Sequence, residues 1–376
     1  MKVLHVITGL GIGGAEQQLR LMIRHLPVSC DVVTLTNPGP VAEGLRADGV
    51  RVTHLGMAGN RDLRAVGRLA RLVRRGAYDL VHTHLYRACV YGRVAARLAG
   101  VRAGVSTEHS LGHAEIEGRP LTAGTRALYL GTERLGSATV AVSPTVAGRL
   151  RQWGVPDERI HVVPNGIDAR AFRFDAHSRR ATRASLGLSP DAFVVGGVGR
   201  LVPGKRFDVL VRAVAALPGV RLVLAGEGPE LASLRALAQR LGAGDRVLFL
   251  GACDASGPGP DVPAVLGAVD VFVSASREES FGLAVVEALA SGLRVLQHTC
   301  PALDDLPAGS APGARRITGD PVELASALKS LAELGPQRLP PPAAVAAYDI
   351  RRSSHHLMDV YRHVLATSRP LERAES

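Results

Sequence analysis

Short apolar runs alternate with amphipathic helical stretches along this chain, and the alternation starts afresh near its middle. Such runs between helices are typical of buried strands in a parallel sheet that is covered on both faces. The pattern predicts an α/β fold of two doubly wound, Rossmann-like domains. The expected strands lie at residues 2–7, 30–36, 51–55, 78–84, 103–109, 138–143 and 160–168, and then at 193–201, 220–228, 246–251, 269–276 and 293–298.

The length of 376 residues also suits two domains, since one domain commonly takes about 150 residues. We expect domains at residues 1–170 and 171–350, followed by a helix and a tail at 351–376. Ligands of doubly wound sheets bind beyond the carboxyl ends of the strands. Two such domains facing each other across a cleft would therefore carry their chemistry in strand-to-helix loops.

The net charge of the chain indicates which kinds of molecule it could bind. The net charge is +11, and residues 1–170 hold 22 basic and 13 acidic residues. A basic domain favours phosphates, anionic lipid or nucleic acid. Aromatic residues make up only 4% and no nucleic-acid-binding motif is present, which argues against specific nucleic-acid binding.

The cysteines and the N-terminal segment bear on the compartment. The four cysteines are widely scattered, in a pattern that indicates neither a zinc site nor a disulfide framework. No apolar run reaches the ~20 residues of a membrane span, and the first apolar run is interpreted as a strand rather than a signal peptide. We expect a cytoplasmic protein.

The loop after the first strand has the spacing G-x-G-x-x-G at Gly9, Gly11 and Gly14. A nicotinamide site would also need an acidic residue where the second strand ends, but Asp31 stands at that strand's start. The loop still fits a phosphate site, because the backbone amides at a helix N-terminus attract phosphate and Gly13 and Gly14 would let the phosphate approach the backbone closely. A tight turn without a ligand is the alternative.

Two glutamates mark the most informative stretch, "SREESFGLAVVEALASG". Glu279 lies in the loop after an apolar strand, and Glu287 lies in the helix that Gly282 and Leu283 open. Carboxylates on both sides of a helix N-terminus suit sugar hydroxyls on either side of a diphosphate.

Two cations stand after the first strand of the same domain, in "GRLVPGKRFD". Arg200 and Lys205 would offset charge that develops on a leaving diphosphate. Each residue alone is compatible with an ordinary surface or capping role, but their joint placement in strand-end loops favours a site.

With these motifs the chain resembles family 4 retaining glycosyltransferases of the GT-B fold, nearly from end to end. The matching blocks are "GGAE" at 13–16, "VVPNGID" at 162–168, "GRLVPGKRFDVLVRA" at 199–213, "LAGEGPELASLRALA" at 224–238, "LFLG" at 248–251 and "EESFGLAVVEALASG" at 278–292.

The resemblance implies an N-terminal acceptor-binding domain, a C-terminal nucleotide-sugar-binding domain and a last helix that crosses back to the first. In the second domain, Arg200 and Lys205 would hold the donor diphosphate, Glu279 the donor sugar and Glu287 the ribose. Backbone contacts to the donor would come from the glycines and neighbours in the matching blocks: Gly13, Gly14, Gly251, Phe281, Gly282 and Leu283.

In the first domain, His109 of "STEHS" would lie at the sugar and the developing charge. His82 and His84 of "VHTH" are expected to be structural, and Asn165 and Gly166 to lie near the hinge between the domains.

The resemblance further implies transfer of a hexose or N-acetylhexosamine with retention at the anomeric carbon, the leaving diphosphate taking the acceptor proton. The protein would then supply positioning and charge stabilisation, and domain closure would exclude water. No cofactor beyond the nucleotide-sugar co-substrate is expected, and no metal, since Asp304 and Asp305 are adjacent and do not form a D-x-D motif.

Two departures from the family pattern leave the donor open. Arg294 stands where a proline is usual, ahead of a loop that touches the donor sugar, and the loop at 251–266 beside the base site is longer than usual. We expect a UDP-linked donor, with guanosine as the open alternative.

A basic helix bears on the acceptor. At 61–75 five arginines recur every three or four residues, as on one helical face: Arg61, Arg64, Arg68, Arg71 and Arg75. Such a helix suits anionic lipid, although a solvated face in an arginine-rich protein is the alternative. We expect a hydroxyl acceptor that is anionic, lipid-linked, a polysaccharide or a secondary metabolite, the loop at 111–120 facing it, and peripheral contact with the inner membrane face.

Three other functions remain open at this point. A nucleotide-sugar epimerase of the same architecture would need acid/base carboxylates around the sugar. A nicotinamide oxidoreductase would need the missing ribose-binding acid. A basic nucleic-acid-binding protein would bind with a steep dependence on salt.

Overall fold

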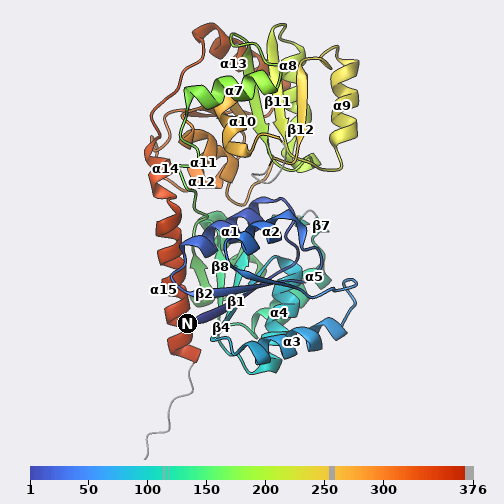
Figure 1. The fold of residues 1–376 in the computed structure, drawn as a ribbon, viewed down its shortest axis with the longest axis vertical. Helices are drawn as coiled ribbons and strands as arrows, with labels where there is room; N and C mark the ends of the chain where they lie inside the picture. The colour runs from blue at the N-terminus through green and yellow to red at the C-terminus, as the bar shows by residue number, and fades with distance from the viewer. Residues whose placement is uncertain (113–114, 118, 254–258, 369–376) are drawn as a thin grey trace, which may run out of the picture. The chain divides into compact units, whose positions relative to one another are not determined.

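The computed structural model describes residues 1–112, 115–117, 119–253 and 259–368 (Figure 1). The chain forms two compact units, one of residues 1–166 together with 350–376 and one of residues 167–349. The division falls at Gly166, a few residues before the boundary expected at 170. The predicted extra-long loop at 251–266 and the loop at 111–120 each lie in part outside the described residues.

The first unit is built on a seven-stranded parallel sheet of order β3-β2-β1-β4-β5-β8-β9. Its strands are β1 Lys2–Ile7, β2 Ser29–Thr34, β3 Arg51–His54, β4 Leu80–His84, β5 Gly104–Glu108, β8 Ala138–Ala141 and β9 Ile160–Val162, with a separate hairpin of β6 Glu115–Ile116 and β7 Arg119–Pro120. Strand β9 is shorter than the run expected at 160–168, because Pro164 has no N–H for a strand ladder.

Helices cover both faces of this sheet. On one face, α3 and α4 pack on Leu4 and Val6, and on the other α1 and α15 pack on Val3 and Val105 (Figure 1). The helices of the unit are α1 Gly14–His25, α2 Gly39–Ala47, α3 Arg64–Gly76, α4 Tyr86–Ala99, α5 Ala123–Glu133, α6 Pro144–Trp153 and α15 Ile350–Ser368, with a 3-10 turn η1 at Asp157–Arg159. The last helix therefore belongs to the first unit.

Helix α3 corrects one prediction. The basic helix expected at 61–75 begins at Arg64, so Arg61 lies outside it. The carboxylate of Asp62 accepts the backbone N–H of Ala65 at 3.2 Å and binds Arg68 at 2.8 Å, which favours a helix start after Asp62.

The second unit has a six-stranded parallel sheet of order β12-β11-β10-β13-β14-β15. Its strands are β10 Phe193–Val198, β11 Val220–Ala225, β12 Val247–Gly251, β13 Val271–Ser274, β14 Arg294–Gln297 and β15 Ala314–Arg316. Its helices are α7 Ala176–Ser185, α8 Phe207–Ala215, α9 Leu231–Arg240, α10 Val262–Ala268, α11 Leu283–Ala290, α12 Pro301–Asp304, α13 Pro321–Leu334 and α14 Ala343–Ala347, with a 3-10 turn η2 at Pro203–Lys205.

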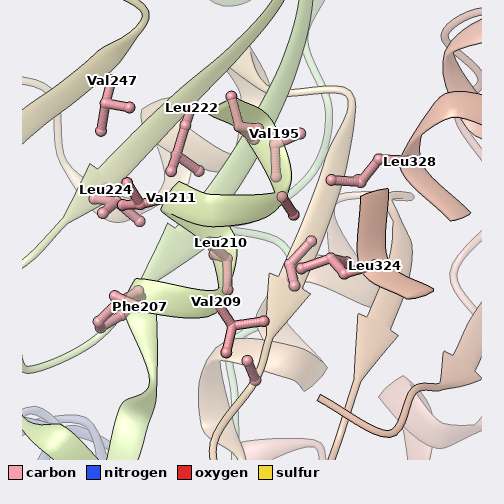
Figure 2. Packing of buried hydrophobic residues seen from close by; sticks show 14 of the residues in the cluster. Val195, Phe207, Val209, Leu210, Val211, Leu222, Leu224, Val247, Leu324 and Leu328 are labelled. Atoms are coloured by element: carbon pink, nitrogen blue, oxygen red, sulfur yellow. The ribbon is translucent and has the colours of Figure 1, made fainter. Parts of the chain in front are cut away.

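The core of the second unit lies between α8, α13 and one face of the sheet (Figure 2). Leu210 of α8 and Leu222 of β11 are fully buried in it, as are Leu324 and Leu328 of α13. Each such side chain contributes about 1.5–3 kcal/mol on burial, so this packing holds α8, and the loop before it, against the sheet.

A buried ion network ties the second unit together. Asp270 is 5% exposed and accepts bonds from Arg179 at 2.5 Å, Arg183 at 2.7 Å and the backbone N–H of Val194 at 2.8 Å. A buried carboxylate that accepts several hydrogen bonds is stable in its ionised form. Removal of the Asp270 side chain would leave Arg179 and Arg183 without their carboxylate partner.

We predict that Asp270→Ala lowers the free energy of unfolding of this unit by about 3–5 kcal/mol. Asp208→Ala removes an exposed partner of Arg212, 3.8 Å away, and serves as the matched control. It should cost less than about 1 kcal/mol. Urea denaturation followed by circular dichroism checks both, and equal effects of the two variants would contradict the assignment.

Candidate functional site

Two loops of the second unit lie side by side because the strands before them are paired. β10 and β13 are parallel neighbours, so both chains leave the sheet at the same edge. The backbone N–H of Arg277 donates to the carbonyl of Gly204 at 3.0 Å and joins the loop after β13 to the loop after β10. Residues more than 70 positions apart in sequence are thus held together.

The principal contact in this site joins Lys205 to Glu279. The Lys205 ammonium lies 2.5 Å from a Glu279 carboxylate oxygen, and these side chains are 30% and 14% exposed. Both residues were predicted as site residues from the sequence, in separate motifs. An accessible, partly desolvated ion pair offers a cation to an anionic ligand and an acceptor to hydroxyl donors.

Arg200 stands in the same loop as Lys205, but it is exposed and makes no ion pair within the described part of the chain. Its backbone carbonyl accepts from Val202 at 2.9 Å, so the loop is shaped around it while its guanidinium faces solvent.

Glycines allow the loops after β10 and β11 to approach closely. A Cβ on Gly226 would lie 1.9 Å from the carbonyl oxygen of Gly199, and one on Gly228 would lie 2.3 Å from that of Leu201. The backbone of Gly226 donates to the carbonyl of Gly251 at 2.7 Å, which places the predicted Gly251 at this same edge. Any side chain at Gly226 or Gly228 would clash with these carbonyl oxygens, so only glycine fits at the two positions.

The backbone before α11 is held by its neighbours. Phe281 is 3% exposed and packs edge-on against Tyr348, with ring centres 4.9 Å apart. Gly282 has φ of +98° and directly precedes Leu283, the first residue of α11. A Cβ on Gly282 would lie 2.5 Å from the sulfur of Cys300, so glycine is required here on two counts.

Glu287 is a carboxylate in a desolvated setting. Its side chain is half-buried, and this burial raises its pKa to about 7 with no hydrogen bond or charged neighbour to offset the effect. A desolvated ionised carboxylate lowers the stability of the protein unless a ligand or solvent donates hydrogen bonds to it. Hydroxyl groups of a bound ligand would supply such donors.

The predicted residues of the first unit lie at the carboxyl edge of its own sheet. Gly13 caps α1, and a Cβ there would lie 2.4 Å from a carboxylate oxygen of Glu16; Gly14 begins the helix. His109 follows β5, and burial lowers its pKa to about 4, so its ring is neutral at pH 7.

A histidine cluster on the first unit was only partly anticipated. His82 and His84 were expected to be structural, whereas His5 was not singled out. One ring nitrogen from each of these three buried residues lies within 4.8 Å of the others, and several of the ring nitrogens are hydrogen-bonded to one another or to hydroxyls. The register that pairs His5 with His82 was the missing signal, because strand pairing is not visible in one sequence.

Comparison with known proteins gives consistent matches. Residues 12–171 match the sequence profile of Glycosyltransferase Family 4, and residues 178–338 match that of Glycosyl transferases group 1. The D-inositol 3-phosphate glycosyltransferase of Saccharomonospora viridis is 32% identical over 320 residues, which cover 78% of this chain and 72% of that protein.

The protein of the same name from Mycobacterium ulcerans is 36% identical over 235 residues, or 59% of this chain. That alignment spans only about half, 49%, of the length of this relative.

Solved structures agree in fold. The crystal structure of Anabaena HepE in complex with UDP has a TM-score of 0.80 at 23% identity, covering 96% of this chain and 100% of that one. WaaG, a glycosyltransferase involved in lipopolysaccharide biosynthesis, has a TM-score of 0.66 at 17% identity, covering 97% and 98%. The fold is therefore that of GT-B glycosyltransferases. The two profile matches and the S. viridis relative show that the chain belongs to glycosyltransferase family 4.

Proposed function

We propose that this protein transfers a hexose or N-acetylhexosamine from a nucleotide diphosphate sugar, with UDP as the favoured nucleotide, to a hydroxyl acceptor. The Lys205–Glu279 ion pair beside the N-terminus of α11 carries the proposal, because it combines a cation for phosphate with a carboxylate for sugar hydroxyls. HepE was crystallised with UDP and with UDP-glucose, which supports the choice of donor.

In the proposed complex the diphosphate draws the Lys205 ammonium toward itself. Glu279 then accepts hydrogen bonds from the donor sugar, and Glu287 accepts them from the ribose. Arg200, exposed in the same loop, adds a second positive charge. Backbone amides at Gly282 and Leu283 face charge that grows on the leaving diphosphate, where fixed donors lower the barrier most.

We further propose that the configuration at the anomeric carbon is retained. In that reaction the leaving diphosphate oxygen takes the acceptor proton on the face from which it departs. The protein side chains position the reactants and stabilise charge without forming a covalent intermediate. No residue role in this proposal calls for a cofactor or a metal.

The acceptor is proposed to be anionic. The relatives from S. viridis and M. ulcerans are named for D-inositol 3-phosphate, an acceptor that carries a phosphate. In this chain the excess of basic residues lies in the first 170 residues. A positive domain raises the local concentration of an anionic acceptor and speeds its association.

We also propose peripheral contact with anionic lipid through α3, in a cytoplasmic protein. A groove of about 440 Å³ lies between α3 and the edge strand β3. Four arginines line it: Arg51, Arg68, Arg71 and Arg75. Only Arg68 among them makes an ion pair within the residues described, with Asp62. None of the described helices is both long and apolar enough to cross a bilayer.

The first test concerns the diphosphate. We expect Lys205→Ala to reduce turnover of UDP-glucose and UDP-N-acetylglucosamine by a factor on the order of 100–1,000, because a charge-stabilising group is lost. Release of UDP, with water or D-inositol 3-phosphate as acceptor, measures it. Lys329→Ala changes the other lysine of this unit, exposed on α13, and should be neutral. Full activity of Lys205→Ala would remove the proposed diphosphate site.

The second test uses the raised pKa of Glu287, about 7 in the unliganded site. Ribose hydroxyls donate to the ionised carboxylate, so lowering the pH from 8 to 5.5 should weaken UDP-glucose binding, by up to about tenfold per unit. UDP-glucose has no group of its own that titrates in this range. Isothermal titration calorimetry measures the dissociation constant at each pH.

Glu287→Gln should bind more weakly at pH 8 and lose this part of the pH dependence. Glu333→Gln, exposed on α13, should keep the parent profile. If Glu287→Gln retains the parent pH profile, Glu287 does not contact the ribose.

The third test addresses α3. Replacing Arg71 and Arg75 together by Gln should weaken binding to vesicles with phosphatidylserine by about 2 kcal/mol, roughly 30-fold, since each surface cation contributes about 1 kcal/mol. Vesicle co-sedimentation measures it, with Arg240→Gln, exposed at the end of α9, as control. Equal binding to neutral and anionic vesicles by the parent protein would reject membrane contact.

A further inference from the structure

The groove between α3 and the edge strand β3 is surrounded by positive charge. Its volume is about 440 Å³, which lies in the range of roughly 300–1,000 Å³ typical of small-molecule sites. Its guanidinium groups come from two elements: Arg51 begins β3, whereas Arg68, Arg71 and Arg75 lie on α3. Steps of three and four residues place the last three on one side of the helix. Because four cations around one cavity repel one another, an anion bound among them would be stabilised.

The floor of the groove is preformed. Tyr78 is 7% exposed, and its ring lies so close to Gly76 that a Cβ on this glycine would collide with it. The Tyr78 hydroxyl donates to Asp31 at 2.7 Å, and the Lys2 ammonium lies 4.6 Å from the ring centre. The other uncharged lining residues are Thr53 and Leu72. Since these contacts fix the Tyr78 ring, the hollow is a permanent feature of the fold.

The acids near the groove already have cation partners. Asp62 binds Arg68 at 2.8 Å. Asp31, the register partner of Arg51 on the neighbouring strand, lies 3.5 Å from the Lys2 ammonium. These two carboxylates therefore leave most of the positive charge of the groove without compensation.

Three of the arginines also keep hydrogen-bond donors available. Arg71 uses only its Nε, which donates to the carbonyl of Gly67 at 3.3 Å. In the part of the chain that the structure describes, neither Arg51 nor Arg75 forms a hydrogen bond or an ion pair. A guanidinium presents its N–H donors as a planar fork that matches two oxygens of one phosphate. The groove therefore offers several such forks to a phosphate group.

The groove lies away from the edge of the sheet that carries the predicted substrate-binding residues. Arg51 is the first residue of β3, and Gly76 and Tyr78 shortly precede β4, so these residues mark the amino ends of their strands. Gly14 and His109 instead follow the carboxyl ends of β1 and β5. A ligand in the groove would therefore anchor the protein and take no part in the transfer reaction.

Exposed leucines beside α3 indicate that the ligand belongs to a lipid surface. Leu63 directly precedes α3 and is 76% exposed, and Leu98 at the end of α4 is 58% exposed. Arg74 links Leu98 to α3 by donating to its carbonyl at 2.8 Å. At a membrane surface, such helices bury apolar side chains at the boundary of headgroups and acyl chains while their cations contact phosphates. A soluble phosphate would make no use of these leucines.

The shape of the groove favours one kind of anionic headgroup. A phosphomonoester carries about 1.5–2 negative charges at pH 7 and three unshared oxygens. The phosphodiester of phosphatidylserine carries one negative charge and has two unshared oxygens. Arginine forks from β3 and from α3 can bind different oxygens of one terminal phosphate. A flat basic helix, by contrast, would respond only to the total charge of the membrane surface.

We propose that the groove between α3 and β3 binds the phosphomonoester headgroup of a membrane lipid, of the kind that phosphatidic acid carries. The inference rests on the proposed contact of α3 with anionic lipid, and it adds a defined site and a preferred headgroup. Arg51 is the residue that distinguishes the two ideas, because it lines the groove but does not belong to the basic face of α3.

The experiment compares two lipids at equal surface charge. The full chain is mixed with phosphatidylcholine vesicles that contain either phosphatidic acid or phosphatidylserine, in amounts adjusted to the same zeta potential. Vesicle flotation at physiological ionic strength gives the two partition coefficients. We expect the parent protein to bind the phosphatidic acid vesicles about tenfold more tightly, as one additional charge-assisted fork would give.

Two variants with the same change in charge locate the site. Arg51→Gln removes a cation of the groove, and Arg64→Gln removes an exposed cation of α3 that does not line the groove. Each should weaken binding to both vesicles by about fivefold, because each surface cation contributes about 1 kcal/mol. Only Arg51→Gln should also lose the preference for phosphatidic acid. The preference is a ratio measured on one protein sample, so a loss of folded protein cancels.

Three results would overturn the assignment. One is a parent preference that Arg51→Gln retains. Another is tight binding of soluble glycerol 3-phosphate by a parent protein that does not bind phosphatidic acid vesicles, which would indicate a free phosphate ligand. The third is binding of duplex DNA that Arg51→Gln weakens more than Arg64→Gln does, which would indicate a nucleic-acid site.

The same measurements separate this inference from the proposed function. Equal binding of the parent protein to both vesicles refutes the headgroup site and leaves the general contact of α3 with anionic lipid in place. Binding to neither vesicle refutes both. Release of UDP from UDP-glucose, measured on the same protein without lipid, tests the transfer reaction independently.

Discussion

The parallel pairing of neighbouring strands is the constraint on which both candidate sites depend. Parallel strands send their carboxyl ends to one edge, so loops that are distant in sequence meet there. In the second unit the pairing of β10 with β13 brings Lys205 to within 2.5 Å of Glu279. In the first unit the pairing of β1, β4 and β5 aligns His5, His84 and His109. Helix packing on the sheets holds these registers, because a shift by one residue would turn every side chain of a strand to the opposite face and break its packing contacts.

Burial gives the charged and titratable groups at these edges their character. Glu287 has a raised pKa because it lies in a desolvated position, whereas the buried histidines have lowered pKa values for the same reason. Both shifts favour the neutral form. The two groups respond differently to these shifts. Hydroxyl donors of a ligand would stabilise the ionised form of Glu287, whereas the neutral histidines hydrogen-bond to one another.

Most of the fold could be predicted from one sequence because apolar alternation is a local signal. The expected strands of both sheets are present, and the predicted helix that Gly282 and Leu283 open corresponds to α11. Boundaries were less predictable, since they depend on side-chain contacts. The start of α3 at Arg64 depends on capping by Asp62, and the end of β9 depends on Pro164. Helix α2 and strand β15 were not anticipated; they are short, with nine and three residues.

The residues of the donor site could be named from the sequence, because Lys205, Glu279 and Glu287 stand in motifs whose spacing is local. Their roles toward a donor remain proposals. Only the tertiary structure showed that Lys205 and Glu279 form an ion pair, that Glu287 is desolvated and that His5 belongs with His84 and His109. The physical reason is that strand order and register set these contacts, and they arise from packing between segments far apart in the chain. The sequence by itself determined the class of fold and the chemistry of the side chains available, and the tertiary structure decided which of them act together.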